Sequence, residues 1–246
     1  MRRFFIDPSE ISKGTPVIEG QDAYHIAGVL RLKPKDHIIL VDGTGFEYKA
    51  EILSSSKNQV AVSIVEKYAA LTESPIGIHV CQGYLKDKKM EMLIRHLTEI
   101  GITRWTPVIS ERSIPQADKK PNPSRIERWH VIAREAVKQC RRTRVPEITP
   151  LTPFQQAVTN SADMDLKIIF YENATVPFSR SIAPDGHPIT QILVIFGPEG
   201  GFSNREIEFA RSNGFLVASL GPRILKAETA SIAACTLIQH IFGDMG

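Results

Sequence analysis

The sequence lacks the usual marks of secreted, membrane-bound and metal-binding proteins. Its three cysteines, Cys81, Cys140 and Cys235, are far apart, odd in number and form no Cys-x-x-Cys pair. None of the seven histidines lies in a recognisable metal-ligand pattern. No stretch approaches the roughly 18 apolar residues of a membrane span, and the start MRRFFIDPSE has no apolar run of signal-peptide length. We therefore predict a cytoplasmic protein that uses neither a metal nor a membrane.

The composition is that of an ordinary globular protein with an uneven charge. The 246 residues fit one large domain or two modest ones, and the 42% hydrophobic content is enough for a core. The net charge is only +3, but the segment from Lys119 to Arg144 holds nine Lys/Arg and two Glu. Such a segment can attract phosphates of a nucleic acid. A solvated helix surface is the competing interpretation.

The first 70 residues read as short strands and turns. HIIL at 37–40 leads to the Asp42-Gly43 step, and FEYKAEIL follows, which is a hairpin signal. Residues 59–68 alternate like a further strand, and one helix is predicted near 22–30. This pattern predicts a small β-rich barrel or sheet over residues 1–70, followed by a linker at 69–75 and a second domain over 74–246.

The second part alternates apolar runs with amphipathic segments, which predicts an α/β domain with a parallel sheet covered on both faces. About five strands are predicted, at 76–84, 105–110, 167–172, 191–197 and 215–221. About four helices are predicted, namely 89–101, one that begins with the capping box Ser124–Glu127, one that begins with the capping box Ser203–Glu206, and 229–242.

Two glycine-containing turns each follow a predicted strand. In Phe196-Gly-Pro-Glu-Gly-Gly-Phe-Ser203, three glycines turn the chain just before a helix. In Leu220-Gly-Pro-Arg-Ile-Leu-Lys-Ala-Glu-Thr-Ala230, the same strand, Gly-Pro and helix order recurs with added charges. Ligands of α/β proteins bind at the carboxyl ends of strands, so the turns could form two walls of one crevice. Neither turn is a phosphate-binding Gly-x-Gly-x-x-Gly or P-loop motif, and a tight strand–helix turn without a ligand remains the alternative.

Most of the chain resembles the SPOUT methyltransferases, and more closely the bacterial family that methylates uridine N3 in small-subunit ribosomal RNA. The segments that carry the resemblance are MRRFF, HIAGVLRLKPKD (25–36), LKDKKMEMLIRHLTEIGI (85–102), SERS (110–113), ERW…REAVKQCRRTRVPEI (127–148), FGPEGGFSNREI and LGPRILKAETA. Two basic positions depart from it: His96 stands where the family more often has Lys, and Lys226 where it often has Arg.

The resemblance implies a fold and a cofactor. The N-terminal domain would be a PUA-like RNA-binding β-barrel, and the C-terminal SPOUT domain an α/β domain with a parallel sheet and a deep trefoil knot. S-adenosylmethionine would lie bent in the knot, in an active site at the interface of a homodimer. The cofactor-binding residues implied are Tyr171, Glu172, Phe196, Gly197, Pro198, Glu199, Gly200, Gly201, Leu220, Gly221, Arg223, Ile224, Leu225, Ala227, Thr229 and Ala230.

Methyl transfer to uridine N3 requires that N3 first lose its proton. A carboxylate could take the proton, and an Arg or Lys could stabilise the resulting anion. Glu135, Gln139 and Arg142 are spaced to share one helix face with Arg128. From spacing alone this face is a salt-bridged surface. The resemblance makes Glu135, Gln139 and Arg142 catalytic candidates, with Arg142 stabilising the uridine anion or a nearby phosphate. The RNA-binding candidates are Arg2, Arg3, Arg31, Lys86 and Arg112.

The function expected from these features is S-adenosylmethionine-dependent methylation of a specific uridine at N3 in 16S ribosomal RNA of the small subunit. Two alternatives stay open. One is a SPOUT enzyme that methylates a ribose 2′-oxygen or another base. The other is an RNA-binding assembly factor without catalytic activity, whose glycine turns would bind no S-adenosylmethionine.

Overall fold

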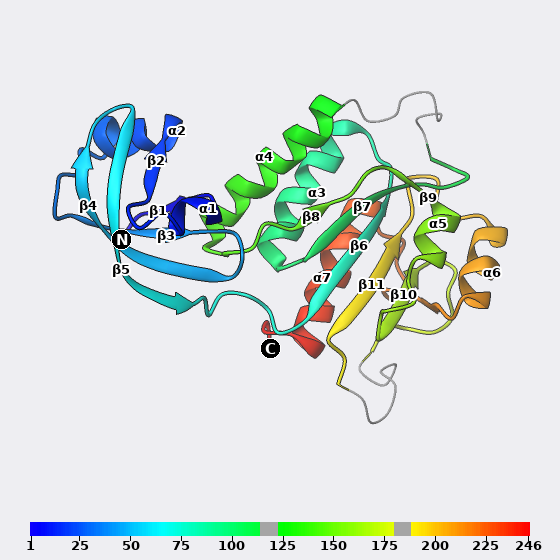
Figure 1. Ribbon diagram of the computed structural model, residues 1–246. Coiled ribbons are helices and arrows are strands. Elements are labelled where there is room, and N and C mark those ends of the chain that lie inside the picture. The colour runs from blue at the N-terminus through cyan, green and yellow to red at the C-terminus, as the bar shows by residue number, and fades with distance from the viewer. Residues whose placement is uncertain (114–122, 180–187) are drawn as a thin grey trace. The chain divides into compact units, whose positions relative to one another are not determined.

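The computed structural model describes residues 1–113, 123–179 and 188–246, and the chain divides into two compact units (Figure 1). Unit 1 comprises Met1–Glu73 together with Val137–Val145. Unit 2 comprises Ser74–Ala136 and Pro146–Gly246. The sequence did not indicate that 137–145 would cluster with the N-terminal residues. Lys119 and Lys120, at the start of the predicted basic segment, lie outside the described residues.

Unit 1 is built on a curled five-stranded sheet with the order β1-β3-β4-β5-β2 (Figure 1). Only the β1–β3 pair is parallel. Inward-facing side chains such as Leu40, Ile52 and Val60 are fully buried in its core. The strands are β1 (Arg3–Phe5), β2 (Val17–Glu19), β3 (His37–Val41), β4 (Phe46–Ser55) and β5 (Gln59–Ala69), and the helices are α1 (Pro8–Ile11), α2 (Gly20–Tyr24) and η1 (His25–Val29).

The predicted hairpin is confirmed, and Asp42 explains its turn. Its carboxylate accepts hydrogen bonds from the backbone N–H and the hydroxyl of Thr44, at 2.8 and 2.7 Å, and from the hydroxyl of Tyr48 at 2.8 Å. Gly43 takes a positive φ of 82°, which a residue without Cβ adopts at little cost. The predicted helix at 22–30 is present as α2 and η1. Its second half is a π-helix, in which the N–H of Leu30 donates to the carbonyl of His25 five residues earlier.

Unit 2 contains a seven-stranded sheet with the order β12-β10-β11-β6-β7-β8, and β9 pairs with β7. All of its strand pairs are parallel, and the five predicted strands are confirmed. The strands are β6 (Gly77–Gly83), β7 (Arg104–Ile109), β8 (Glu147–Ile148), β9 (Thr152–Pro153), β10 (Leu166–Phe170), β11 (Gln191–Phe196) and β12 (Leu216–Ala218).

The predicted helices are present, with one addition and one correction. The addition is the short α5, whose six residues are too few for a clear periodic pattern. The correction concerns Ser124, which was predicted as an N-cap but lies inside the first turn of α4. The helices are α3 (Asp87–Ile100), α4 (Pro123–Cys140), α5 (Phe154–Thr159), α6 (Asn204–Ser212) and α7 (Ala227–Phe242). In the described part of the chain, no helix combines the length and apolar character that a membrane crossing requires.

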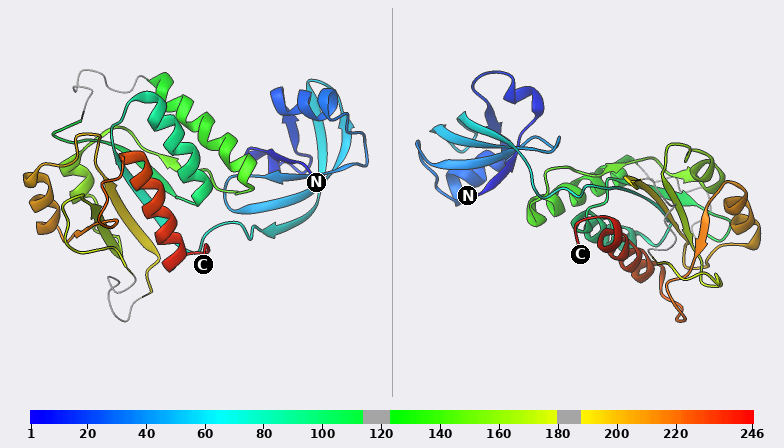
Figure 2. Two further views of the ribbon diagram at one scale, coloured as in Figure 1. Left: turned by 180° about the vertical axis from the view of Figure 1, so that it is seen from behind. Right: turned by 90° about the horizontal axis from the view of Figure 1, so that it is seen from below.

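Helices cover both faces of this sheet (Figure 2). On one face, Leu193 and Ile195 of β11 share a core with α5 and α6. Because strand side chains alternate, Val194 points to the opposite face. That face is covered by α3, α4 and α7, and Trp129 of α4 packs edge-on against Trp105 of β7 with ring centroids 5.0 Å apart. The predicted α/β class with a covered parallel sheet is confirmed, while the trefoil knot stays a prediction.

Candidate active site

The carboxyl ends of three neighbouring strands, β10, β11 and β12, meet at one edge of the unit 2 sheet. The first predicted glycine turn follows β11 and ends at Ser203, the N-cap of α6. The Ser203 hydroxyl accepts a hydrogen bond from the Glu206 N–H at 3.3 Å, and the Glu206 carboxylate accepts one from the Ser203 N–H at 2.9 Å. This capping box was predicted, and it fixes where the turn stops and the helix begins.

The two glycine turns, separated by 16 residues in the sequence, line one cavity of about 480 Å³. This volume lies within the range of small-molecule sites. All the predicted cofactor-binding residues except Thr229 line the cavity. The full lining is Lys89, Phe170, Tyr171, Glu172, Phe196, Gly197, Pro198, Glu199, Gly200, Gly201, Phe202, Ser219, Leu220, Gly221, Arg223, Ile224, Leu225, Lys226, Ala227, Glu228 and Ala230.

Glycines keep the backbone close to this cavity. Gly201 has a φ of 66°, and a Cβ placed on it would come within 2.8 Å of Oε1 of Glu172. A Cβ on Gly83, at the end of β6, would come within 2.4 Å of the backbone nitrogen of Pro198. Gly83 was not singled out from the sequence, because a lone glycine at a strand end gives no sign of which loop packs against it. Both positions therefore require glycine for the turn after β11 to close.

A charged cluster in the cavity was missed by the sequence reasoning. The Lys89 ammonium of α3 lies 3.2 Å from Oε1 of Glu199 and 3.3 Å from Oε1 of Glu228. Burial tends to lower the pKa of Lys89, but its hydrogen bonds to the two carboxylates outweigh burial and raise that pKa. Lys89 precedes the apolar stripe of α3, so the sequence gave it the appearance of a solvated residue. Its partners lie 110 and 139 positions further along the chain, beyond the reach of any local pattern.

The catalytic candidates lie outside the lining of the cavity, and one prediction about them was wrong. Arg142 was expected to share a helix face with Glu135 and Gln139. However, α4 ends at Cys140, and Arg141 turns the chain with a φ of 67°. Glu135 and Gln139 are therefore exposed on the helix, whereas the Arg142 side chain is only 4% exposed.

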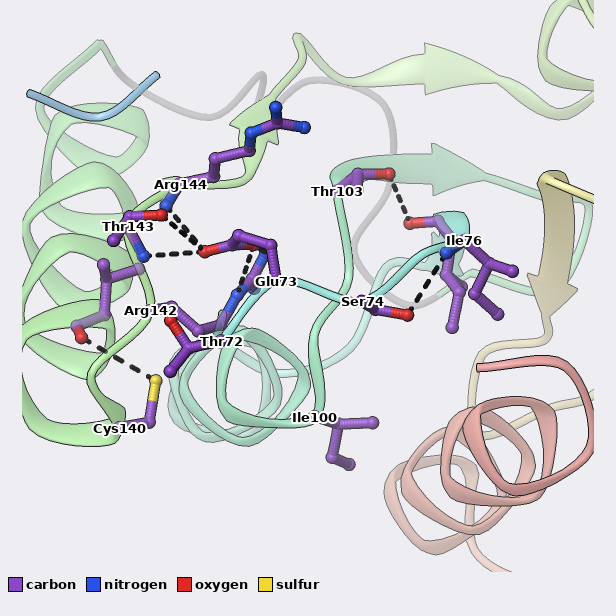
Figure 3. A network of polar contacts seen from close by, with 12 residues as sticks. Thr72, Glu73, Ser74, Ile76, Ile100, Thr103, Cys140, Arg142, Thr143 and Arg144 are labelled. Atoms are coloured by element: carbon purple, nitrogen blue, oxygen red, sulfur yellow. Dashed lines mark hydrogen bonds and ion pairs between the residues drawn. The ribbon is translucent and has the colours of Figure 1, made fainter. Parts of the chain in front are cut away.

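Arg142 forms a buried ion pair with Glu73 (Figure 3). Its Nε and Nη2 atoms donate to Oε2 of Glu73 at 3.2 and 2.9 Å. The other oxygen, Oε1, accepts hydrogen bonds from the backbone N–H groups of Thr143 and Arg144 at 2.6 and 2.9 Å. Glu73 thus fixes the chain that follows α4. The sequence placed Glu73 in a linker and gave it no role, because its partners lie about 70 residues away.

The RNA-binding candidates differ in their surroundings. Arg2, Arg31, Lys86 and Arg112 are exposed, and Arg112 donates a hydrogen bond to the carbonyl oxygen of Gly200 at 3.2 Å. Arg3 forms an ion pair with Glu47 at 2.7 Å and also donates to the carbonyl of Arg141 at 2.6 Å. Within the described residues, no group of three or more His, Cys, Asp or Glu side chains could hold a metal ion.

Comparison with known proteins gives matches for both parts of the chain. Residues 72–239 match the family described as RNA methyltransferase domain. Residues 18–65 match the family described as RNA methyltransferase PUA domain, which confirms the PUA assignment. The ribosomal RNA small subunit methyltransferase E of Bacillus subtilis is 33% identical over 250 residues, covering 98% of this chain and 96% of the relative. The protein of the same name from Buchnera aphidicola of Acyrthosiphon pisum is 33% identical, covering 92% and 88%.

Solved structures share the fold over nearly the whole chain. A ribosomal RNA small subunit methyltransferase E from Neisseria gonorrhoeae, bound to S-adenosylmethionine, has a TM-score of 0.85 at 29% identity, with 100% of both chains covered. A putative methyltransferase from Legionella pneumophila, in complex with the same cofactor, has a TM-score of 0.84 at 33% identity, with 98% of both chains covered.

Proposed function

The chain belongs to the RNA methyltransferase family that includes the ribosomal RNA small subunit methyltransferases E, and we propose that it methylates a specific uridine at N3 in 16S ribosomal RNA, with S-adenosylmethionine as donor. The observation that carries the proposal is the cavity formed jointly by the glycine turns after β11 and β12. Relatives that bind S-adenosylmethionine share this fold over their full length.

The residues of the cavity fit this donor. Phe170, Phe196 and Phe202 offer apolar surface for an adenine ring. The glycine turns bring backbone N–H and C=O groups within reach of a nucleoside, because no Cβ intervenes. When bound, the donor supplies a methyl group on a positively charged sulfur that is already a good leaving group. The protein has to align the donor with the target base and to exclude water, so its contribution is largely proximity and orientation.

Polar residues of the chain have to remove the proton from uridine N3 and stabilise the anion that results. We assign its removal to Glu135, the stabilisation of the uridine anion to Arg142, and the orientation of the base to Gln139. These three residues are not in the cavity lining, so we propose that a second copy of the chain completes the site in a homodimer. Mixing an Arg142→Ala protein with a Gly201→Val protein should then restore activity, because one of the two sites would be intact. Mixtures as inactive as their parents would refute this arrangement.

Arg142 needs a separate test because it also holds Glu73. We expect Arg142→Ala to abolish methyl transfer while the affinity for the cofactor stays unchanged. Arg142→Lys keeps the charge but loses the two-pronged geometry of the guanidinium, so it should retain only part of the activity. A fully active Arg142→Ala protein would remove Arg142 from the catalytic residues.

RNA binding is assigned to unit 1 and to exposed basic residues. Arg2, Arg3 and Arg31 would contact phosphates from unit 1, and Lys86 and Arg112 from unit 2. Lys and Arg contacts to phosphates release counterions, so RNA affinity should fall with added salt. Replacing Arg2, Arg3 and Arg31 by Ala should weaken binding and flatten this salt dependence. Unchanged affinity and slope would contradict the assignment.

The reaction itself is tested with labelled donor and RNA that lacks the modification. The protein is incubated with free 16S ribosomal RNA and with assembled small subunits, and the methylated nucleoside is identified by mass and mapped. We expect 3-methyluridine at a single position. Methylation at a ribose 2′-oxygen or another base would contradict the proposed specificity, and the absence of both transfer and cofactor binding would identify a non-catalytic RNA-binding protein. Ribosomal RNA as substrate would place the reaction in the cytoplasm.

A further inference from the structure

Three charged side chains from three different elements meet at one corner of the cavity. Lys89 comes from α3, Glu199 from the turn after β11, and Glu228 from the first turn of α7. The ammonium of Lys89 bridges the two carboxylates at 3.2 and 3.3 Å. The corner therefore brings two carboxylates and one ammonium into direct contact.

Glu228 is incompletely partnered in this cluster. Its side chain is 17% exposed, and its Oε1 atom takes the contact with Lys89. Its Oε2 atom is buried and has no hydrogen-bond partner. An ionised oxygen that is buried without a donor is costly, so native proteins usually supply one. The last torsion of a glutamate is soft, so the carboxylate can turn toward a donor that enters the cavity.

Lys89 has one donor beyond those used in its two contacts. An ammonium carries three N–H groups, and two point to Glu199 and Glu228. The corner thus offers a carboxylate oxygen that needs a donor, next to an ammonium with a further N–H. An α-amino acid presents the complementary pair, a cationic ammonium and a carboxylate on the same carbon.

We propose that Lys89 and Glu228 form the subsite for the amino-acid end of S-adenosylmethionine, in which Glu228 accepts hydrogen bonds from the α-ammonium and Lys89 donates to the α-carboxylate. This rests on the proposed function, because it presumes that donor. Glu199 holds Lys89 in place from the other side. Phe170 and Phe196, which line another part of the cavity, would hold the uncharged adenosine end.

The test measures binding without any RNA or methyl transfer. S-Adenosylhomocysteine and 5′-methylthioadenosine are both neutral thioethers, and the second lacks the amino-acid end. Their dissociation constants are measured by calorimetry for the wild-type protein and for Glu228→Gln. Loss of one charged hydrogen bond predicts about ten- to a hundredfold weaker binding of S-adenosylhomocysteine. The affinity for methylthioadenosine should stay within about twofold, which also shows that the variant is folded.

Two further variants sharpen the comparison. Lys89→Gln should likewise weaken the binding of S-adenosylhomocysteine and leave that of methylthioadenosine unchanged. It replaces Glu228→Gln as the test if the Glu228→Gln protein fails to fold. The control is Glu208 of α6, which lies outside the cavity lining and forms an exposed ion pair with Arg211. Glu208→Gln should therefore leave both affinities and their ratio unchanged.

Two outcomes would overturn the proposal. In the first, Glu228→Gln and Lys89→Gln weaken the binding of both nucleosides by the same factor. In the second, they weaken the binding of neither. Either result would mean that the corner does not recognise the amino-acid end. If the wild-type protein binds neither nucleoside, the proposed function itself fails and the subsite with it, which is a distinct result from a wild-type protein that binds both.

Discussion

Removing the carboxylate of Glu73 should destabilise unit 1 far more than its position in a connecting segment suggests. In Glu73→Ala, the buried guanidinium of Arg142 loses its ion pair with Glu73, and the backbone N–H groups of Thr143 and Arg144 lose their acceptor. Breaking one side of a buried ion pair costs about 3–5 kcal/mol. A buried N–H without an acceptor costs about 1–3 kcal/mol, and the two losses overlap because they share one carboxylate.

We therefore expect Glu73→Ala to lower the free energy of unfolding by about 4 kcal/mol. In a chain of this size, that corresponds to a fall in melting temperature of roughly 8–16 °C. Glu73→Gln keeps one acceptor oxygen but turns an NH₂ group toward other donors, so its loss should be smaller. The matched control is Glu147→Ala, which breaks an ion pair to Arg104 with a similar distance of 2.8 Å but an exposed setting. Exposed pairs contribute about 0–1 kcal/mol.

The assay is urea unfolding followed by two signals. Both tryptophans of the chain, Trp105 and Trp129, lie in unit 2, so their fluorescence reports that unit, whereas far-ultraviolet circular dichroism reports both. We expect Glu73→Ala to shift the dichroism transition more than the fluorescence transition. Equal stabilities of the Glu73→Ala and Glu147→Ala proteins, within about 0.5 kcal/mol, would refute the reasoning from burial.

Three further predictions concern unit 2 and its cavity. Gly201→Ala and its control in unit 1, Gly43→Ala, both place a Cβ on a residue with a positive φ, 66° and 82°, so each should lower the free energy of unfolding by about 1–2 kcal/mol. Only Gly201→Ala, whose Cβ approaches the cavity carboxylate Glu172, should weaken the binding of S-adenosylhomocysteine in calorimetry. Equal affinities of the two variants for this ligand would contradict the glycine requirement. Burial and the charge of Arg104 lower the pKa of His79 from 6.5 to about 4, so between these pH values the unfolded chain binds a proton that the folded chain does not. The free energy of unfolding should therefore fall as the pH drops from 6.5 toward 4, by at most about 3 kcal/mol. This part of the pH dependence should be missing in urea titrations of His79→Gln. Trp129→Ala empties a fully buried position and should cost about 3–5 kcal/mol in the same titrations, whereas a loss below about 1 kcal/mol would mean that the site refills.

The sequence was informative wherever one short segment carries its own physical signal. The Asp42 turn, the Ser203 capping box and the apolar strands of unit 2 were all predicted, because side-chain spacing and glycine placement act on the nearest few residues. The two glycine turns could be assigned to one crevice because parallel strands bring their carboxyl ends to the same edge of a sheet. The likeness of these turns to a known family then supplied a donor and a reaction, which periodicity alone does not contain.

Tertiary structure decided which charged residues face one another. Arg142 followed the helical spacing of Glu135 in the sequence, but Arg141 ends the helix and the side chain turns to Glu73 instead. Lys89 resembled a solvated residue until folding placed it between carboxylates more than a hundred positions away. Local pattern fixes backbone conformation because its interactions are between sequence neighbours. The partner of a buried charge depends on how elements that are distant in the sequence pack together. A desolvated charge is costly unless it is paired, so it pairs with the opposite charge that tertiary packing places beside it.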